Sequence, residues 1–276
     1  MRRIHAPYTT NSPLANEEIR RMASSVFAEQ PISAVSDRYS FVPTSSILDG
    51  MREIGWMPVA AQQQLVRNDE RRGFQKHLLR FQRREHVGTD IANRPEVLVL
   101  NSHDKSSAYQ IHVGVFRFVC SNGMILADSV FESISIKHYG FNPERIIEAS
   151  FGILESVPQL MDDIKEMQDI RLTDIQRKAF AVGALALKWG EPEKAPIRPE
   201  KVLEPLRWQD SGSDLYSTLN VVQEHLVKGG DKDYGKRNAI GRVSPRTRSV
   251  KGIDENVRLN KALWHMANVL KGGEIA

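Results

Sequence analysis

The sequence predicts an α+β fold, in which an antiparallel β-sheet has helices packed on one face and is followed by a mostly helical C-terminal region. Two observations favour this class. Segments that alternate between apolar and polar residues, or that are rich in β-branched and aromatic residues, are concentrated between residues 56 and 138. Segments with apolar residues at helical spacing lie on both sides of this stretch. Strands grouped apart from helices are typical of α+β proteins.

Two helices are expected before the sheet. Asn16–Ala28 repeats apolar residues at helical spacing beside a charged face, and Asn16 is its candidate N-cap. Thr44–Ile54 carries one apolar stripe and ends at Gly55, a residue that readily adopts the left-handed conformation of a helix end.

Five strands are expected next. A charged turn over residues 68–73 joins the first two, and the polar turn 101–107 joins the third and fourth. The predicted strands are Trp56–Arg67, Phe74–Arg84, Glu96–Leu100, Ala108–Cys120 and Ile134–His138.

The period then changes to that of helices. Asn142, Pro143 and Glu144 supply the N-cap, the N1 proline and the early acid of a helix that runs to Val157, where Pro158 kinks or restarts it. The other predicted helices are 173–189, which opens with a capping box, 208–228 and 256–270.

The proline-rich stretch 190–205 predicts an exposed connection and the likeliest domain boundary. We therefore expect an α+β core domain over residues 1–190 and a helical C-terminal region over 191–276, which carries a basic loop at 228–251.

Composition limits the class of protein. The chain has 276 residues, of which 41% are hydrophobic and 26% charged, and its longest apolar stretches are far short of the ~20 residues that a membrane span needs. No apolar signal segment follows the charged N-terminus, so we expect a cytoplasmic protein with no membrane partner. A single cysteine, Cys120, excludes an intramolecular disulfide and a cysteine-based zinc site.

The net charge of +4 is concentrated in two places. Residues 65–86, here the first basic cluster, hold seven basic and three acidic residues. Residues 228–251, the second basic cluster, hold eight basic and two acidic residues. The remainder is net acidic. Concentrated Lys and Arg favour nucleic-acid binding, because neutralising phosphates releases condensed counterions.

The candidate nucleic-acid-binding residues come from both clusters. In the first, Phe74, Phe81 and His77 are interleaved with cations and could stack on bases. The alternative is that Phe74 and Phe81 are core residues. The second is either a flexible basic arm or an ordinary solvated loop. The candidates are Arg67, Arg71, Arg72, Lys76, His77, Arg80, Phe81, Arg83, Arg84, Lys236, Arg237, Arg242, Arg246 and Arg248.

Signals for catalysis are weak. Asn101-Ser102-His103-Asp104 contains triad residue types, but immediate neighbours cannot converge as a triad, so a turn is expected. The histidines and Asp104 lack the spacing of a known metal site, and Gly229-Gly230 is not followed by a Walker-type motif. We expect a protein that is not an enzyme and that has no metal or cofactor.

Three groups of residues carry a resemblance to a known family: Ser36–Tyr39 with Pro43-Thr44, Lys76–Phe81, and Asn101–Asp104 with Ala108–Gln110 and Gly114–Gly123. The chain is similar to the phage/plasmid-like family catalogued as domain of unknown function 932, in the branch carried by mobile elements, although Lys105 stands where a glycine is expected. The order of helix, Gly55-Trp56, strands and long helix is also similar to the Rad-type, Red-beta, Erf and Sak annealing proteins.

These resemblances imply a non-enzymatic protein that binds single-stranded DNA and anneals strands in recombination, as a homo-oligomeric ring or filament. Two alternatives remain open. One is a protein-binding factor of a mobile element that does not bind DNA. The other is a metal-dependent hydrolase built around His77, His103, Asp104 and His138.

Overall fold

The computed structural model of the chain describes residues 11–35, 39–89, 93–117, 124–126, 134–136, 151–238 and 240–273. The predicted helix start at 142–144, Cys120, His138 and parts of the family-like strings (36–38 and 118–123) lie outside these residues. The chain divides into two compact units, Met1–Val157 and Pro158–Ala276. The boundary expected at residue 190 differs from this division, because the helix Asp174–Trp189 packs on later helices of the second unit.

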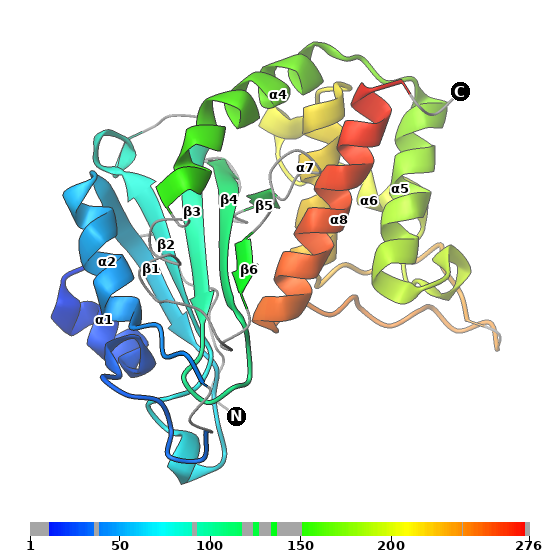
Figure 1. Ribbon diagram of the computed structural model, residues 1–276. Helices are drawn as coiled ribbons and strands as arrows, with labels where there is room; N and C mark the ends of the chain where they lie inside the picture. Colours follow the sequence, from blue (N-terminus) through cyan, green and yellow to red (C-terminus); the bar gives the residue numbers. More distant parts are fainter. Residues whose placement is uncertain are drawn as a thin grey trace. The chain divides into compact units, whose positions relative to one another are not determined.

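The first unit is built on a six-stranded antiparallel sheet (Figure 1). Strands β1, β2, β3 and β4 are neighbours in chain order, and β5 and β6 both pair with the outer edge of β4. The α+β class is confirmed, and the expected strands are present within the described residues; β5 is an additional strand. The bounds are β1 Trp56–Gln63, β2 His77–Arg83, β3 Asn93–Asn101, β4 Tyr109–Arg117, β5 Met124–Leu126 and β6 Ile134–Ile136.

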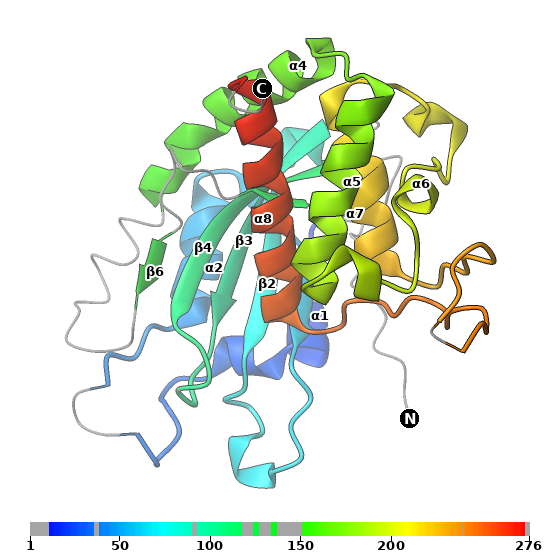
Figure 2. The ribbon, with the colours of Figure 1, turned by 90° about the vertical axis from the view of Figure 1, so that its right-hand side faces the viewer.

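Helices α1 (Asn16–Met22) and α2 (Thr44–Glu53) contact β1 and lie on the same face of the sheet (Figures 1 and 2). The predicted helix 16–28 is interrupted at Ala23 and continues as the 3-10 turn Ser24–Phe27. The predicted N-cap at Asn16 is wrong. Ala15 is the cap residue and its N–H donates to Glu18, while the side chain of Asn16 accepts a hydrogen bond from Arg52.

The helix-covered face of the sheet forms the apolar core of the first unit. Leu79 lies opposite Val99, and Phe81 opposite Val97, so these side chains share one face, and all four are buried. Gly55 joins α2 to β1 at a φ of +85°, as the sequence predicts. At the free edge of β1, the carbonyl oxygen of Pro58 accepts a hydrogen bond from the N–H of Leu14 at 2.8 Å.

The second unit is helical. Helices α5 (Asp174–Trp189), α7 (Leu215–Lys228) and α8 (Ile253–Lys271) pack on one another, with the short α6 (Pro199–Val202) against α5 and α7 (Figure 2). Helix α4 (Val157–Asp169) begins at the division, after the 3-10 turn Ile153–Ser156.

Two predictions concern the starts of these helices. The helix predicted from Trp208 begins at Leu215, because the Asp214 carboxylate caps it by accepting from the N–H of Ser217. The capping box at Thr173 is confirmed.

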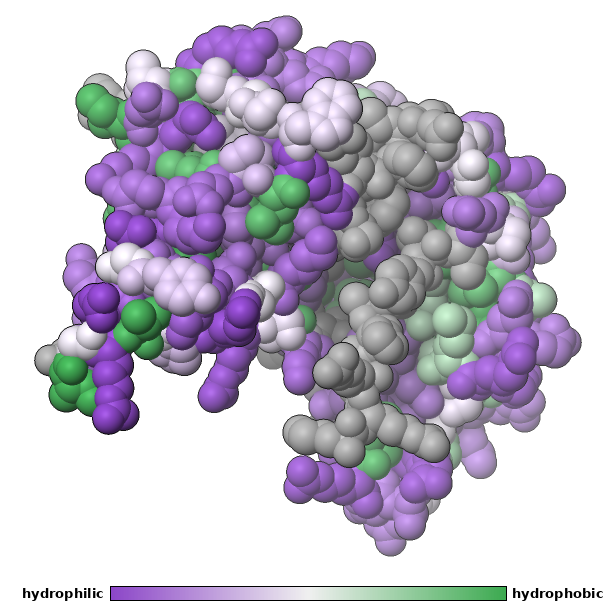
Figure 3. All heavy atoms as spheres, turned by 180° about the vertical axis from the view of Figure 1, so that it is seen from behind, coloured by the Kyte–Doolittle hydropathy of each residue, from purple (hydrophilic) through white to green (hydrophobic). Residues whose placement is uncertain are grey.

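The proline-rich stretch is not wholly exposed. Ala195, Ile197 and Val202 are buried, so this segment belongs to the packed part of the second unit rather than to a free linker. None of the described helices is both long enough and apolar enough to cross a membrane. The side seen in Figure 3 is mostly hydrophilic where it is described, with small separate groups of hydrophobic residues.

Candidate nucleic-acid interface

Part of the first basic cluster, which the sequence predicts to be a binding surface, is buried. His77 and Phe81 are 0% exposed, and Lys76 and Arg80 are 7% exposed. The expectation that Phe81 and His77 stack on bases is therefore wrong, because both point from β2 into the core beneath α2. Lys76 and Arg80 are likewise buried, so neither is placed to contact phosphates.

Carboxylates neutralise three arginines of this cluster. Arg80 binds Glu96 through Nε at 2.7 Å and through Nη2, and Gln82 donates to the other oxygen of Glu96. Arg71 makes a two-pronged contact with Asp104 at 2.7 and 2.9 Å. Arg72 pairs with Asp69 in the turn. These carboxylates neutralise positive charge of the arginines, which leaves less positive charge to attract a ligand.

Arg67, Arg83 and Arg84 are the exposed members of the cluster without a carboxylate partner among the described residues. The guanidinium of Arg83 lies 5.2 Å from the ring centroid of Trp56, a cation–π contact. The first basic cluster therefore presents a few scattered cations rather than a continuous basic groove.

The Asn101–Asp104 string lies at the end of β3 and in the turn that follows it, as predicted. Asn101 donates to the carbonyl oxygen of Val42 and to the hydroxyl of Thr44, and His77 shares a 2.8 Å hydrogen bond with the same hydroxyl. Tyr39 donates to the carbonyl oxygen of Ser102. The string therefore ties the chain before α2 to the end of the sheet.

The same turn contains Lys105 at a φ of +65°, the one non-glycine residue with a positive φ in the described part of the chain. This is the position at which the family resemblance leads us to expect glycine, and the backbone geometry explains that expectation.

Two of the groups proposed for a metal site, His77 and Asp104, have other partners. Asp104 is held by Arg71, and burial lowers the pKa of His77 to about 4 against smaller opposing effects of the Gln75 carbonyl and Asp104, so His77 is neutral. Burial and the nearby Asp104 raise the pKa of Tyr39. Within the described residues, which exclude His138, no three His, Cys, Asp or Glu side chains are grouped so that they could hold a metal ion.

The second basic cluster is folded back onto the helices rather than extended as an arm. His225 on α7 shares a 2.9 Å hydrogen bond with Asp231, and Asp231 also accepts from Thr247 across the loop. The backbone adds a bond from the N–H of Gly230 to the carbonyl oxygen of Thr247. The two ends of the loop are thereby held together beside the end of α7.

The surroundings of His225 favour its charged form. Its Nδ1 faces the Asp231 carboxylate and its Nε2 lies 2.8 Å from the carbonyl oxygen of Glu204, so a ring that carries both protons can donate to an acceptor on each side. Burial lowers the pKa of His225, but these two bonds outweigh burial, and the net pKa is raised. Burial acts against Asp231 as well, yet its contacts with His225 and Thr247 lower its pKa.

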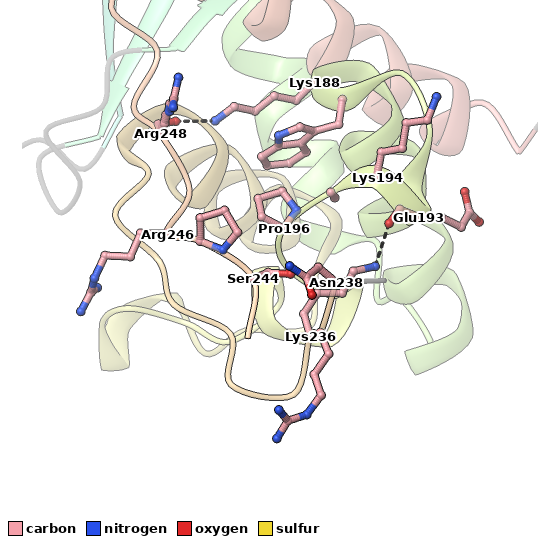
Figure 4. Close-up of a pocket in the computed structure, with 13 residues that line it drawn as sticks. Lys188, Glu193, Lys194, Pro196, Lys236, Asn238, Ser244, Arg246 and Arg248 are labelled. Carbon is pink, nitrogen blue, oxygen red and sulfur yellow. Dashed lines mark hydrogen bonds between the residues drawn. The ribbon is translucent and has the colours of Figure 1, made fainter. Parts of the chain in front are cut away.

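A cavity of about 570 Å³ opens between the end of α5, the segment that follows it and the second basic cluster (Figure 4). Thirteen described residues line it, of which six are Lys or Arg and one, Glu193, is acidic. The lining residues are Lys188, Trp189, Glu193, Lys194, Ala195, Pro196, Lys236, Arg237, Asn238, Ser244, Pro245, Arg246 and Arg248.

The cations of this cavity are held mainly by neutral carbonyl oxygens. Lys236 donates to the carbonyl of Glu193 at 2.9 Å, and Lys188 donates to the carbonyl of Arg248 (Figure 4). Lys188 also donates to the carbonyl of Leu226. Arg237 and Arg246 donate to the carbonyls of Gly241 and Gly230. Lys194 is the exception, since it pairs with Glu191. Carbonyl contacts fix the side chains without cancelling their charge.

Lys188 is half-buried. Burial lowers its pKa, although Asp231 and Glu255 act in the opposite direction. Its Nζ also lies 4.8 Å from the centroid of the Trp189 ring. The cavity wall thus joins an aromatic face to fixed positive charge.

A rigid turn lies within the second cluster. The Asp233 carboxylate accepts from the guanidinium and the backbone N–H of Arg198 and from the N–H of Gly235. Gly235 packs so closely on the Arg198 guanidinium that a Cβ would collide with it. Tyr234, between these residues, is 73% exposed.

Of the predicted candidates, Lys236, Arg237, Arg246 and Arg248 are brought together at the cavity, and Arg242 is exposed in the same loop. Sequence reasoning missed Lys188, Trp189, Lys194 and Tyr234. Trp189 ends an Ala-rich run that is typical of a buried helix, and only its position before Gly190 signals that the helix stops there and leaves the indole at a surface.

Comparison with known proteins identifies the family but adds no solved structure, since none matches. The family model described as "Domain of unknown function (DUF932)" matches residues 31–264. Two relatives from Escherichia coli (strain K12) are similar over 259 residues, which cover 94% of this chain and 92% of each relative. They are UPF0380 protein YafZ at 39% identity and UPF0380 protein YfjQ at 38%. The chain therefore belongs to the DUF932 family.

Proposed function

We propose that this protein binds nucleic acid through the basic cavity of its second unit. The observation that carries the proposal is the set of cations around the cavity, which are fixed mainly by carbonyl oxygens rather than neutralised by carboxylates. Positive charge that is concentrated and uncompensated attracts phosphates, and the release of their counterions drives binding.

The contrast with the first basic cluster supports this choice of surface. There, Arg71, Arg72 and Arg80 each contact a carboxylate. Both clusters have a positive formal charge in the sequence, but in the second unit six Lys and Arg residues are among those that line a cavity of about 570 Å³. Pockets of about 300–1,000 Å³ are typical of binding sites for small molecules or single ligand groups.

The fullest form of the proposal is a strand-annealing protein of a mobile element that acts in recombination, as a homo-oligomer. Annealing needs a surface that holds phosphates while bases remain free to pair, and it needs neither a nucleotide cofactor nor an acid–base pair. The fixed cations of the cavity suit such a role. An annealing assay with two complementary strands tests the annealing activity, and light scattering tests the homo-oligomeric state.

The direct test of binding is fluorescence anisotropy of a labelled DNA strand at increasing salt. We expect the apparent affinity to fall steeply, with log K decreasing by about 0.7 to 0.9 per contacted phosphate for each unit of log salt. The double variant Arg237→Glu/Arg248→Glu, which reverses two exposed cavity cations, should weaken binding at least about tenfold and reduce the salt slope.

The matched control is Arg67→Glu/Arg84→Glu, which makes the same change of net charge on exposed residues of the first basic cluster. We expect a clearly smaller loss. Circular dichroism of all variants checks that they fold. Absence of binding at low salt, or an equal loss in the control, would contradict the proposal.

A second candidate function is protein binding without nucleic acid. Leu206 and Trp208 favour it, because both are large apolar residues left exposed, Trp208 to 81%, in the connection between α6 and α7. Under this alternative the protein shows no salt-dependent DNA binding, and Trp208→Ala removes association with its protein partner.

A further inference from the structure

We infer that Trp189 and Tyr234 form a base-stacking subsite, so that the ligand of the basic cavity is a nucleic-acid strand with unpaired bases. This inference rests on the proposed function. It also replaces the aromatic residues that the sequence suggested, since His77 and Phe81 are buried in the sheet.

Trp189 is placed to meet a base inside the cavity. It is the last residue of α5, and Gly190, at a φ of +81°, turns the chain away directly after it. The indole is half-buried and lines the cavity together with Lys188, Lys236 and Arg248. One nucleotide combines an apolar aromatic face with a negative phosphate, and this wall offers a partner for each.

Tyr234 is placed to meet a base outside the cavity. Its neighbour Asp233 is fixed by hydrogen bonds from Arg198 and Gly235 with lengths of 2.9 to 3.3 Å. The N–H of Lys236 donates to the carbonyl oxygen of Asp233, which closes the turn. An exposed ring on a fixed backbone loses little conformational entropy when a base stacks on it.

Tyr234 lies close in sequence to residues that line the same cavity as Trp189. Lys236 and Arg237, which line the cavity, follow Tyr234 by two and three residues. Stacking on both rings requires that a strand whose phosphate lies on these cations places one neighbouring base against each ring. In a duplex the bases stack on one another and offer no free face, so this arrangement selects single strands.

The first test uses tryptophan fluorescence. Of the four tryptophans, Trp56 and Trp264 are buried and Trp208 is exposed, so the variant Trp208→Phe leaves Trp189 as the accessible indole. Adding a thymidine oligonucleotide to this variant should quench its fluorescence, and a duplex of equal length should not. The double variant Trp208→Phe/Trp189→Phe should still bind but lose the quenching.

The second test uses Tyr234, whose exposed side chain can be removed without disturbing the core. Tyr234→Ala should weaken single-strand binding by roughly 5- to 150-fold, the equivalent of one stacked base, and leave duplex binding unchanged. Tyr234→Phe keeps the ring and should retain the affinity. Trp208→Ala, which removes another exposed aromatic residue, is the control and should bind as the parent does.

The outcomes separate this inference from the function on which it rests. Salt-dependent binding without quenching, equal quenching by duplex, or unchanged affinity of Tyr234→Ala overturns the stacking subsite and leaves the proposed function standing. A failure of both strand forms to bind at low salt overturns the proposed function itself.

Discussion

The ammonium group of Lys188 lies 2.8 Å from the backbone carbonyl oxygen of Arg248. The same Nζ also donates to the carbonyl of Leu226 near the end of α7, so one side chain of α5 joins a helix to the second basic cluster. The backbone carbonyl of Arg248 takes part in this junction, and Arg248 is also one of the residues that line the cavity.

Replacing Lys188 should loosen this loop. Lys188→Met keeps the apolar stem but removes two hydrogen bonds from a charged donor, and we expect the free energy of unfolding to fall by about 2–3 kcal/mol. The loop over residues 229–252 should also become more sensitive to trypsin. Urea titration and limited proteolysis measure the two effects. Lys178→Met, which removes only an exposed pair with Glu200, should change stability by less than about 1 kcal/mol.

The contacts of His225 predict a pH dependence. The pKa of His225 is raised in the folded state. The contribution of His225 to the free energy of unfolding is therefore fully present below the ordinary pKa of 6.5, and it is lost as pH rises through the folded pKa. Asp231, with a lowered pKa, contributes above its ordinary value of 3.8, and its contribution is lost as pH falls through the folded pKa. Stability should therefore decline above pH 6.5.

The test compares the free energy of unfolding of the parent with that of His225→Gln, each measured by urea titration from about pH 5 to 9. Glutamine cannot titrate, so the variant should be less stable at acidic pH and should lose stability less steeply as pH rises. Parallel profiles for the two proteins would show that His225 is not the titrating group.

Arg80 should matter for stability rather than for binding. Arg80→Met leaves the Glu96 carboxylate buried without its charged partner, and we expect a loss of about 3–5 kcal/mol in the free energy of unfolding. Arg83→Met, three positions further along the same strand, gives up an exposed cation–π contact and should cost about 0.5–1 kcal/mol. Folded protein of either variant should keep most of its affinity for DNA.

Lys105→Gly should stabilise the protein. Lysine at a φ of +65° carries a backbone penalty of roughly 1–2 kcal/mol that glycine does not, and its ammonium group makes only a long hydrogen bond to the Ala34 carbonyl. We expect a net gain of about 1 kcal/mol, measured as a higher thermal midpoint. A lower midpoint would show that the lysine side chain contributes more than its exposed position indicates.

The sequence predicts the strands of the sheet better than it predicts which of their side chains are buried and paired. Arg80 and Phe81 are neighbours on β2 and therefore lie on opposite faces of the strand, although both are among the binding candidates predicted from the sequence. A basic residue on the face opposite the core is ordinarily solvated, but Arg80 is buried with Glu96, a residue sixteen positions away. No local pattern shows this pairing, because it depends on the register between β2 and β3.

The cavity illustrates the same limit. Its walls come from residues 188–196 and 236–248, which are brought together by hydrogen bonds such as that from Lys236 to the carbonyl of Glu193. The sequence reveals the charge of the second basic cluster but not that backbone carbonyls hold it. Every residue has a backbone carbonyl oxygen, so residue identity does not indicate such contacts. A capping box depends on particular side chains, and the one predicted at Thr173 is confirmed.

The edge of β1 bears on how copies of this chain could assemble. Pro58 has no N–H to offer a further strand, and its carbonyl oxygen is already occupied by Leu14. On the other side of the sheet, β5 and β6 occupy the outer positions of β4. Both edges are therefore poor templates for a further strand, because β1 is interrupted at Pro58 and the described strands β5 and β6 are only three residues long. A ring or filament of this protein is expected to be joined by side-chain surfaces, and its subunits should separate in high salt or detergent far more readily than strands joined as a continuous sheet.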